Sequence, residues 1–195
     1  MQKFLAVFSI AFVLSLVSTP SFADSAYKVS GASQIKIDVY HPTKHIKAYN
    51  KAGSVQGNVT IKSSLIPGKT VEVTGSVEIV VGALESGNGR RDRYMRSVLG
   101  GATSIIRFVP KSLTMKTMNP SGGSGELIGD FTINNNTNPV TFQASFEGDI
   151  LKGGKVVVQI KTHVLCSAYK IKRPALLWVP IKDKVDLAMT LHFTK

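Results

Sequence analysis

The chain has 195 residues, of which 43% are hydrophobic and 18% are charged, and its formal net charge is +12. This hydrophobic fraction excludes an intrinsically disordered chain. The single cysteine, Cys166, excludes a disulfide within the chain. The length is typical of one domain.

Residues 1–23 are typical of a secretory signal peptide. Lys3 supplies the positive start, and Phe4–Val17 is apolar apart from two serines. This run of 14 residues is shorter than the about 20 that a membrane-spanning helix needs. We expect cleavage after Ala23 and a mature domain over residues 24–195, periplasmic in a Gram-negative bacterium or otherwise secreted. An uncleaved N-terminal anchor is the alternative.

Apolar and polar residues alternate through most of the remaining chain, as in β-strands that bury one face. From Thr70 onward, the odd positions up to Val81 are apolar or glycine, and the even positions are mostly polar. The same alternation recurs over residues 35–39, 59–61, 127–133, 140–146, 156–164 and 185–193. A strand pair or one bent strand, with a bulge near Pro110, is expected over 104–118. The total is eight to nine strands.

Two stretches do not follow this alternation. Ser86–Gly100 predicts a short helix, which Asn88 or Ser86 caps and which the paired glycines 100 and 101 end. Cys166–Asp183 contains two prolines and predicts a long connection over an opening, with Leu176, Leu177 and Trp178 near its middle. Because no crossover helices separate the strands, the sheet is antiparallel. It must close into a barrel or form two layers to hide its apolar face and its edges.

A closed barrel of about eight strands is either filled by its own side chains or holds one small ligand. The inward positions are mainly Val, Ile, Leu and Phe, together with Met115 and Met189. Any ligand inside is therefore apolar along most of its length. Periodicity alone leaves the packed interior and the ligand-binding interior open.

Three segments resemble motifs of the YceI-like family. Arg91–Ser97 is similar to its R-D-x-H-L-R-S helix start, although Tyr94 stands where that pattern has His. Residues 107–113 resemble the strand that follows this helix. Gly125–Val140 resembles the family's G-D-L-T hairpin, with Asn136 and Asn138 in place of Gly and of Lys or Arg. The likeness spans residues 53 to 193.

This resemblance implies an all-β fold, a single closed antiparallel barrel of the lipocalin-like, YceI type with one short helix. It also implies a periplasmic or secreted protein that binds and carries an amphiphile, an isoprenoid or a long-chain fatty-acid derivative, without catalysis. In this interpretation Arg91 and Tyr94 meet the polar head, and Trp178 with its neighbours covers the mouth. The ligand-binding residues are then Val77, Ile79, Val81, Arg91, Tyr94, Phe108, Leu113, Phe131, Phe142, Val158, Ile160, Trp178 and Leu187.

No constellation in the sequence points to catalysis, a metal or a cofactor. Pro42 separates His41 from His45, and His163 and His192 fall on outward strand positions. No nucleophile-elbow or zinc-binding motif occurs. Two alternatives to a carrier remain: a secreted structural or stress-response barrel with a filled core, and a lipid-modifying enzyme.

Two further features leave their interpretation open. Cys166 is either a buried small apolar residue or a thiol activated by Lys170, Lys172 and Arg173. The basic segment Arg90–Arg96 is either solvated and paired with its own aspartate, or binds an anionic lipid head or membrane surface. Nucleic acid is not an expected partner, whereas a homodimer is compatible with the sequence.

Overall fold

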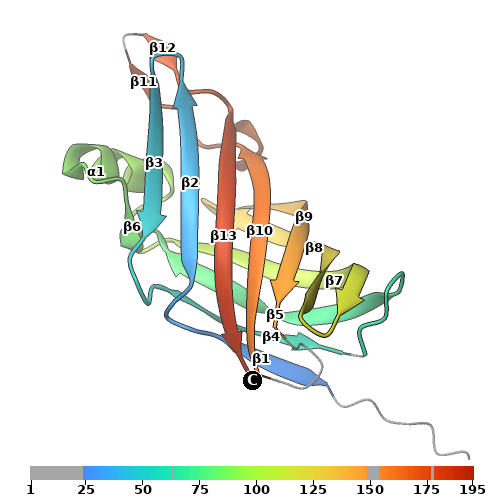
Figure 1. Cartoon of the computed structure of the whole chain (residues 1–195). Helices are drawn as coiled ribbons and strands as arrows, with labels where there is room; N and C mark the ends of the chain where they lie inside the picture. Colours follow the sequence, from blue (N-terminus) through green and yellow to red (C-terminus); the bar gives the residue numbers. More distant parts are fainter. Residues whose placement is uncertain (1–23, 63, 149–153, 177) are drawn as a thin grey trace, which may run out of the picture.

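The computed structural model describes residues 24–62, 64–148, 154–176 and 178–195. The predicted signal peptide lies outside these ranges, as does Leu177. In the described chain, eleven strands form one antiparallel sheet (Figure 1). They are β1 (Ser25–Val29), β2 (Gln34–His41), β3 (Lys44–Asn50), β4 (Val55–Ile61), β5 (Thr70–Val80), β6 (Leu84–Glu85), β7 (Ile105–Asn119), β8 (Gly122–Ile133), β9 (Asn136–Glu147), β10 (Lys155–Leu165) and β13 (Lys184–Thr194).

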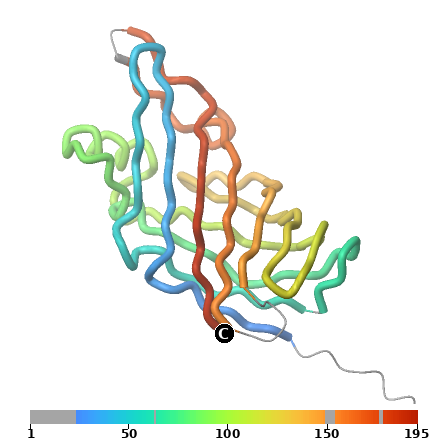
Figure 2. Tube along the Cα trace, in the orientation of Figure 1, coloured from blue at the N-terminus to red at the C-terminus, as the bar shows by residue number. Residues whose placement is uncertain are grey.

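Eight of these strands close into a barrel, in the order β1-β4-β5-β7-β8-β9-β10-β13. The ring closes because the last residues of β13 pair with β1, with Val29 opposite Phe193. Figure 2 shows these first and last described strands side by side at one end of the molecule. The prediction of a closed antiparallel barrel is therefore confirmed.

The other three strands extend the sheet beyond the ring. The first part of β13 pairs with β2 instead of β1, with Val185 opposite Val39. β2 then pairs with β3, and β3 pairs with the short β6. The β2–β3 hairpin thus rises past one end of the barrel (Figure 1). As a result, the apolar face of this hairpin is turned toward a space that the barrel strands do not enclose.

The helix and the long connection lie beside this hairpin. α1 (Gly89–Val98) lies within the predicted helical segment, and the Asn88 side chain caps it by accepting a hydrogen bond from the Arg91 N–H at 3.0 Å. β6 leads from the edge of β3 into α1, which places the helix next to the hairpin. The connection after β10 contains a short 3₁₀ helix, η2 (Ser167–Tyr169), and a two-stranded hairpin. The hairpin strands are β11 (Ala175–Leu176) and β12 (Val179–Pro180). No described helix is long and apolar enough to cross a bilayer.

The long strand β7 bends around the barrel by changing register. Its pairing with β8 shifts between Pro110 and Ser112 and again between Met115 and Thr117. The first shift confirms the bulge predicted near Pro110, because a proline cannot donate a backbone hydrogen bond to the ladder. The bend lets one strand contribute Phe108 to the hairpin end of the interior and Leu113 to the closed end.

Candidate functional site

Two hollows in the interior formed by the described residues differ greatly in size. The larger one has a volume of about 550 Å³ and lies between the β2–β3 hairpin, the upper parts of the barrel strands and α1. Its apolar walls are formed by Ile35, Ile37, Val39, Ile46, Ala48, Val77, Ile79, Leu84, Met95, Val98, Leu99, Ile106, Phe108, Phe131, Ile133, Val164, Cys166, Ile171, Pro174, Ala175, Ile181, Val185, Leu187 and Met189, with Tyr94.

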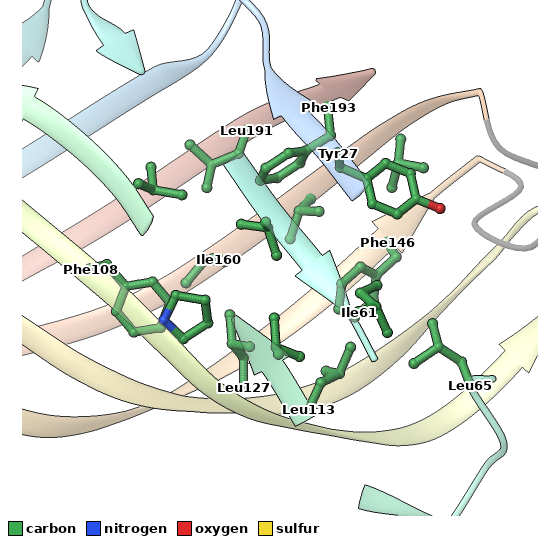
Figure 3. Close-up of a pocket in the computed structure, with 16 residues that line it drawn as sticks. Tyr27, Ile61, Leu65, Phe108, Leu113, Leu127, Phe146, Ile160, Leu191 and Phe193 are labelled. Atoms are coloured by element: carbon green, nitrogen blue, oxygen red, sulfur yellow. The ribbon is translucent and has the colours of Figure 1, made fainter. Parts of the chain in front are cut away.

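The smaller hollow lies in the closed end of the barrel and has a volume of only about 70 Å³. Figure 3 shows its lining side chains, with Phe108 at one end and Leu65 at the other. This end of the barrel is close to a packed interior, because its lining side chains, such as Leu113 and Ile160, are nearly fully buried. Periodicity alone left open a packed interior and a ligand-binding interior. The closed end of the barrel corresponds to the first, and the hairpin end to the second.

The helix α1 contributes to the wall of the larger hollow, together with the barrel strands and the β2–β3 hairpin. Val98 follows Tyr94 by four positions and Met95 by three, so the three side chains lie on one side of α1 and line the hollow. The preceding glycine and serine residues and the Asn88 cap start the helix at this point of the chain.

Polar groups are confined to the part of the lining near α1 and the tip of the β2–β3 hairpin. They belong to His41, Lys44, Glu78, Ser86, Asn88, Arg90 and Arg91. Glu78 is paired with Arg107, whose Nε lies 2.7 Å from its carboxylate. Within the described chain, Arg90 and Lys44 have no carboxylate partner. The polar rim therefore carries uncompensated positive charge.

Arg91 and Asp92 connect the start of α1 to Ser86 by hydrogen bonds. The Arg91 guanidinium donates to the Ser86 hydroxyl at 2.7 Å and to the Ser86 carbonyl at 2.6 Å. The buried Asp92 carboxylate accepts from the Ser86 N–H at 2.9 Å and from the Ser86 hydroxyl. Arg91 thus lines the hollow while its guanidinium is engaged with the chain itself, so the rim's free charge comes from Arg90 and Lys44.

Ten of the thirteen predicted ligand-binding residues line one of the two hollows. The larger hollow takes Ile79, Arg91, Tyr94, Phe131 and Leu187, the smaller takes Leu113, Val158 and Ile160, and Val77 and Phe108 line both. The sequence predicted that all these residues line one tunnel, whereas the structure divides them between two hollows.

The remaining three predicted residues line neither hollow. Val81 and Phe142 are fully buried, and the Phe142 ring packs behind Phe108 and Phe131 with centroid distances of 4.8 and 6.3 Å. Trp178 is 97% exposed and projects into solvent from the β11–β12 hairpin, so its side chain does not cover the hollow. Leu177 lies outside the described residues.

Sequence reasoning missed the contribution of β2 and β3. Ile35, Ile37 and Val39 were recognised as a strand face but not as part of a site, and β3 was not predicted. Met189 has the same parity as Leu187 on β13 and lines the same hollow. Parity alone could have added Met189. The hairpin residues needed knowledge of the register between β2 and β13.

Cys166 is a buried free thiol in the wall of the larger hollow. Burial raises the pKa of this thiol, the nearby Asp183 raises it further, and Arg173 only partly opposes them. A raised pKa keeps the sulfur protonated at neutral pH, where a thiol is a weak nucleophile. The structure therefore favours the interpretation of Cys166 as a small apolar wall residue.

The histidines are spread over the molecule. His41 is buried, with its Nε2 donating to the Val179 carbonyl at 3.0 Å, and His45 stacks on Tyr40 at a centroid distance of 4.6 Å. No group of three or more His, Cys, Asp or Glu side chains in the described ranges is arranged to hold a metal ion.

A family model for the YceI-like domain matches residues 27–193. The chain belongs to the YceI-like family. The family that the sequence motifs indicated is thereby confirmed. No curated protein sequence matches the chain.

Solved structures share this YceI-like fold at low sequence identity. BcnA of Burkholderia cenocepacia is 15% identical, with a TM-score of 0.61 over 84% of this chain and 98% of its own. A polyisoprenoid binding domain from Saccharophagus degradans is 10% identical, with a TM-score of 0.62 over 86% and 97%. The YceI protein of Campylobacter jejuni is 11% identical, with a TM-score of 0.51 over 100% and 99%. These likenesses show the fold.

Proposed function

We propose that this YceI-like protein is a non-enzymatic binding protein that sequesters or carries an amphiphilic lipid, an isoprenoid or a long-chain fatty-acid derivative. The observation that supports this most is the apolar hollow of about 550 Å³ beneath a positively charged rim. Ligand sites in proteins commonly have volumes of about 300–1,000 Å³. One apolar wall and one polar rim suit a molecule with one apolar and one polar end.

The apolar part of such a ligand gains its binding energy from burial. Each methylene group taken out of water contributes about 0.8 kcal/mol. The walls formed by Ile37, Ile79, Leu187 and their neighbours present no hydrogen-bonding side chain to a chain lying between them. A hydrocarbon tail therefore fits this space better than a sugar or a nucleotide does.

The polar end of the ligand is an anion in this proposal. Arg90 and Lys44 lie on the rim without a carboxylate partner in the described chain, and an anionic head supplies one. Arg91 contributes mainly by holding the rim in place, because its guanidinium already donates to Ser86. The structural relative from Saccharophagus degradans, a polyisoprenoid binding domain, supports a lipid as the ligand class.

Binding without turnover agrees with the state of the two candidate nucleophiles in the lining. The pKa of the Cys166 thiol is raised, mainly by burial, so little thiolate forms at neutral pH. The Ser86 hydroxyl donates to the Asp92 carboxylate and accepts from the Arg91 Nε–H, so it is held in the hydrogen-bond network at the start of α1. These two observations favour a carrier over a lipid-modifying enzyme.

The proposed location is the periplasm or the cell exterior, which the signal-peptide pattern of residues 1–23 supports. We also propose contact with an anionic membrane surface at the hairpin of β11 and β12. Trp178 is fully exposed there, and the exposed Lys172 and Lys182 flank the hairpin in the chain. Tryptophan favours the membrane interface and lysine favours an anionic surface.

The experiment that tests the ligand class is mass spectrometry of an organic-solvent extract of the full-length protein, purified from the compartment to which its own signal directs it. We expect an amphiphile at close to one molecule per chain. A protein that carries no amphiphile and binds none from a delivered lipid mixture would instead be a structural barrel. Release of a chemically altered lipid would indicate an enzyme.

A further inference from the structure

Two neighbouring side chains separate the larger hollow from the smaller one. Val77 on β5 and Phe108 on β7 are directly paired across the two strands. They are the only described residues that line both spaces. Phe108 stands at one end of the smaller hollow in Figure 3. The pair therefore forms a partition across the interior.

The Phe108 ring is held from two sides. The fully buried Phe142 ring packs against it with a centroid distance of 4.8 Å and an angle of 59° between the ring planes. On the neighbouring strand, Gly129 leaves room for the ring. A Cβ atom at position 129 would lie 2.6 Å from Phe108 Cε2 and 2.7 Å from Cζ. A side chain on residue 129 would push the ring away, so the glycine is part of the partition.

The volumes on the two sides of this partition differ enough to decide where a chain can lie. A methylene group is close in size to a water molecule, which takes about 30 Å³ in the liquid. On that scale the larger hollow, at about 550 Å³, holds roughly 18 methylene-sized groups. The smaller hollow, at about 70 Å³, holds roughly two.

We propose that Val77 and Phe108 are the floor of the ligand site and set the longest apolar chain that the protein buries completely. The ligand class is then a single-chain anionic amphiphile of up to roughly 18 methylene-sized groups, the polar head included, such as a long-chain carboxylate or a short prenyl phosphate. Longer polyisoprenoid chains leave their excess length in water. This inference rests on the proposed function and adds the chain length to it.

The test measures the dissociation constant of delipidated full-length protein for a series of straight-chain fatty acids that extends on both sides of this length, with a long polyprenyl phosphate added. For the wild type, each added methylene tightens binding by up to about fourfold until the chain reaches the floor. Beyond that length, we expect no further gain.

Variants of Phe108 should move this break in opposite directions. Phe108→Leu shortens the floor side chain and should shift the break to longer chains, whereas Phe108→Trp should shift it to shorter ones. The matched control is Val156→Ala, which enlarges only the smaller hollow and should leave the break in place. Leu and Trp were chosen at position 108 because both are large and apolar. Since changes in the core can unfold the protein, a thermal unfolding curve checks that each variant is folded.

Three outcomes are distinguishable. A break that follows the size of residue 108 supports the floor. A break at the same length in all variants, or a wild-type affinity that keeps rising through the polyprenyl chain, overturns the floor and leaves a lipid carrier. No binding of any chain by the wild type overturns the carrier itself, and the floor with it.

Discussion

The Asp92 carboxylate in the first turn of α1 accepts two hydrogen bonds from Ser86, one from its N–H at 2.9 Å and one from its hydroxyl. Asp92 is buried, and Arg91 donates to the same serine. The Arg91–Asp92 pair of the family motif thus holds the start of α1 to Ser86, the residue that follows β6. It fixes one wall of the larger hollow.

Replacing Asp92 by Ala should destabilise the protein without touching a ligand. Ser86 loses the acceptor of two part-buried hydrogen bonds, and hydrogen bonds to charged groups contribute about 1.5–3 kcal/mol each. For a domain of this size, each kcal/mol lowers the unfolding temperature by about 2–4 °C. Differential scanning calorimetry measures the change. Arg93→Ala, at an exposed position of the same helix, is the control and should unfold at the wild-type temperature.

A charge placed in the wall of the larger hollow should abolish lipid retention. Ile79→Arg buries a guanidinium without a partner, so we expect no amphiphile in its extract. Ile37→Arg makes the same change at a half-buried wall residue, where folding is less at risk. Lys155→Glu alters charge on the exposed side of β10 and should retain lipid. Equal lipid content in all three would contradict the proposed pocket.

Removing the rim charges should weaken binding of anionic amphiphiles selectively. Arg90→Gln and Lys44→Gln each delete one exposed cation, so each should raise the dissociation constant for a fatty acid by up to about fivefold. The corresponding fatty alcohol, which has a neutral head, should bind all variants equally. Lys161→Gln, on the exposed side of β10, serves as the control. If head charge makes no difference, the rim does not bind the head.

Cys166 should react slowly with alkylating reagents while the protein is folded. Burial and then Asp183 raise the pKa of its thiol, with Arg173 opposing them, so the folded state holds the thiol proton more tightly than the unfolded state does. The stability that this proton linkage provides is present below the ordinary thiol pKa and is lost as pH rises through the raised one. The extent of iodoacetamide modification is measured by mass spectrometry at a series of alkaline pH values. Its midpoint should lie at a higher pH in the folded protein than in the unfolded chain.

Trp178 should report and promote membrane contact. It is the chain's only tryptophan and is 97% exposed, so its fluorescence emission should move to shorter wavelength when anionic vesicles are added. Neutral vesicles should have no such effect, because lysines near the surface contribute about 1 kcal/mol each only at an anionic one. In sedimentation, Trp178→Ala should bind less than the wild type, whereas Ile66→Ala, at another exposed apolar residue, should bind equally.

Alternation predicted the strands, because inward and outward positions of a strand differ in polarity wherever one face is buried. The family resemblance then favoured a closed barrel over two layers. The helix was predicted because Asn88 caps it and glycines follow it. β1 and β3 were missed, since β3 turns only Ile46 and Ala48 toward the interior and β1 only Tyr27 and Val29. Runs this short and mixed carry little periodicity.

The site was predicted only in part, because the size of a cavity is set by distances between elements that are remote in sequence. Parity could assign Phe108 to the interior but not to a partition, since that role depends on Gly129 and Phe142 of other strands. Trp178 was expected over the mouth on account of its apolar neighbours. In the structure it has a left-handed backbone conformation, with φ of 70°, and points into solvent.

The position of β13 has a consequence for how this chain acquires its shape. β13 is the final strand, yet it pairs with β10, with β2 and, at its end, with β1. Until Lys184–Thr194 has emerged, three strand edges lack their neighbour, and unpaired edges invite association between molecules. Closing the ring pairs β1 with β13, which are far apart in the sequence, and such long-range pairing slows folding. The barrel of a nascent chain therefore cannot close before residues 184–194 have left the ribosome.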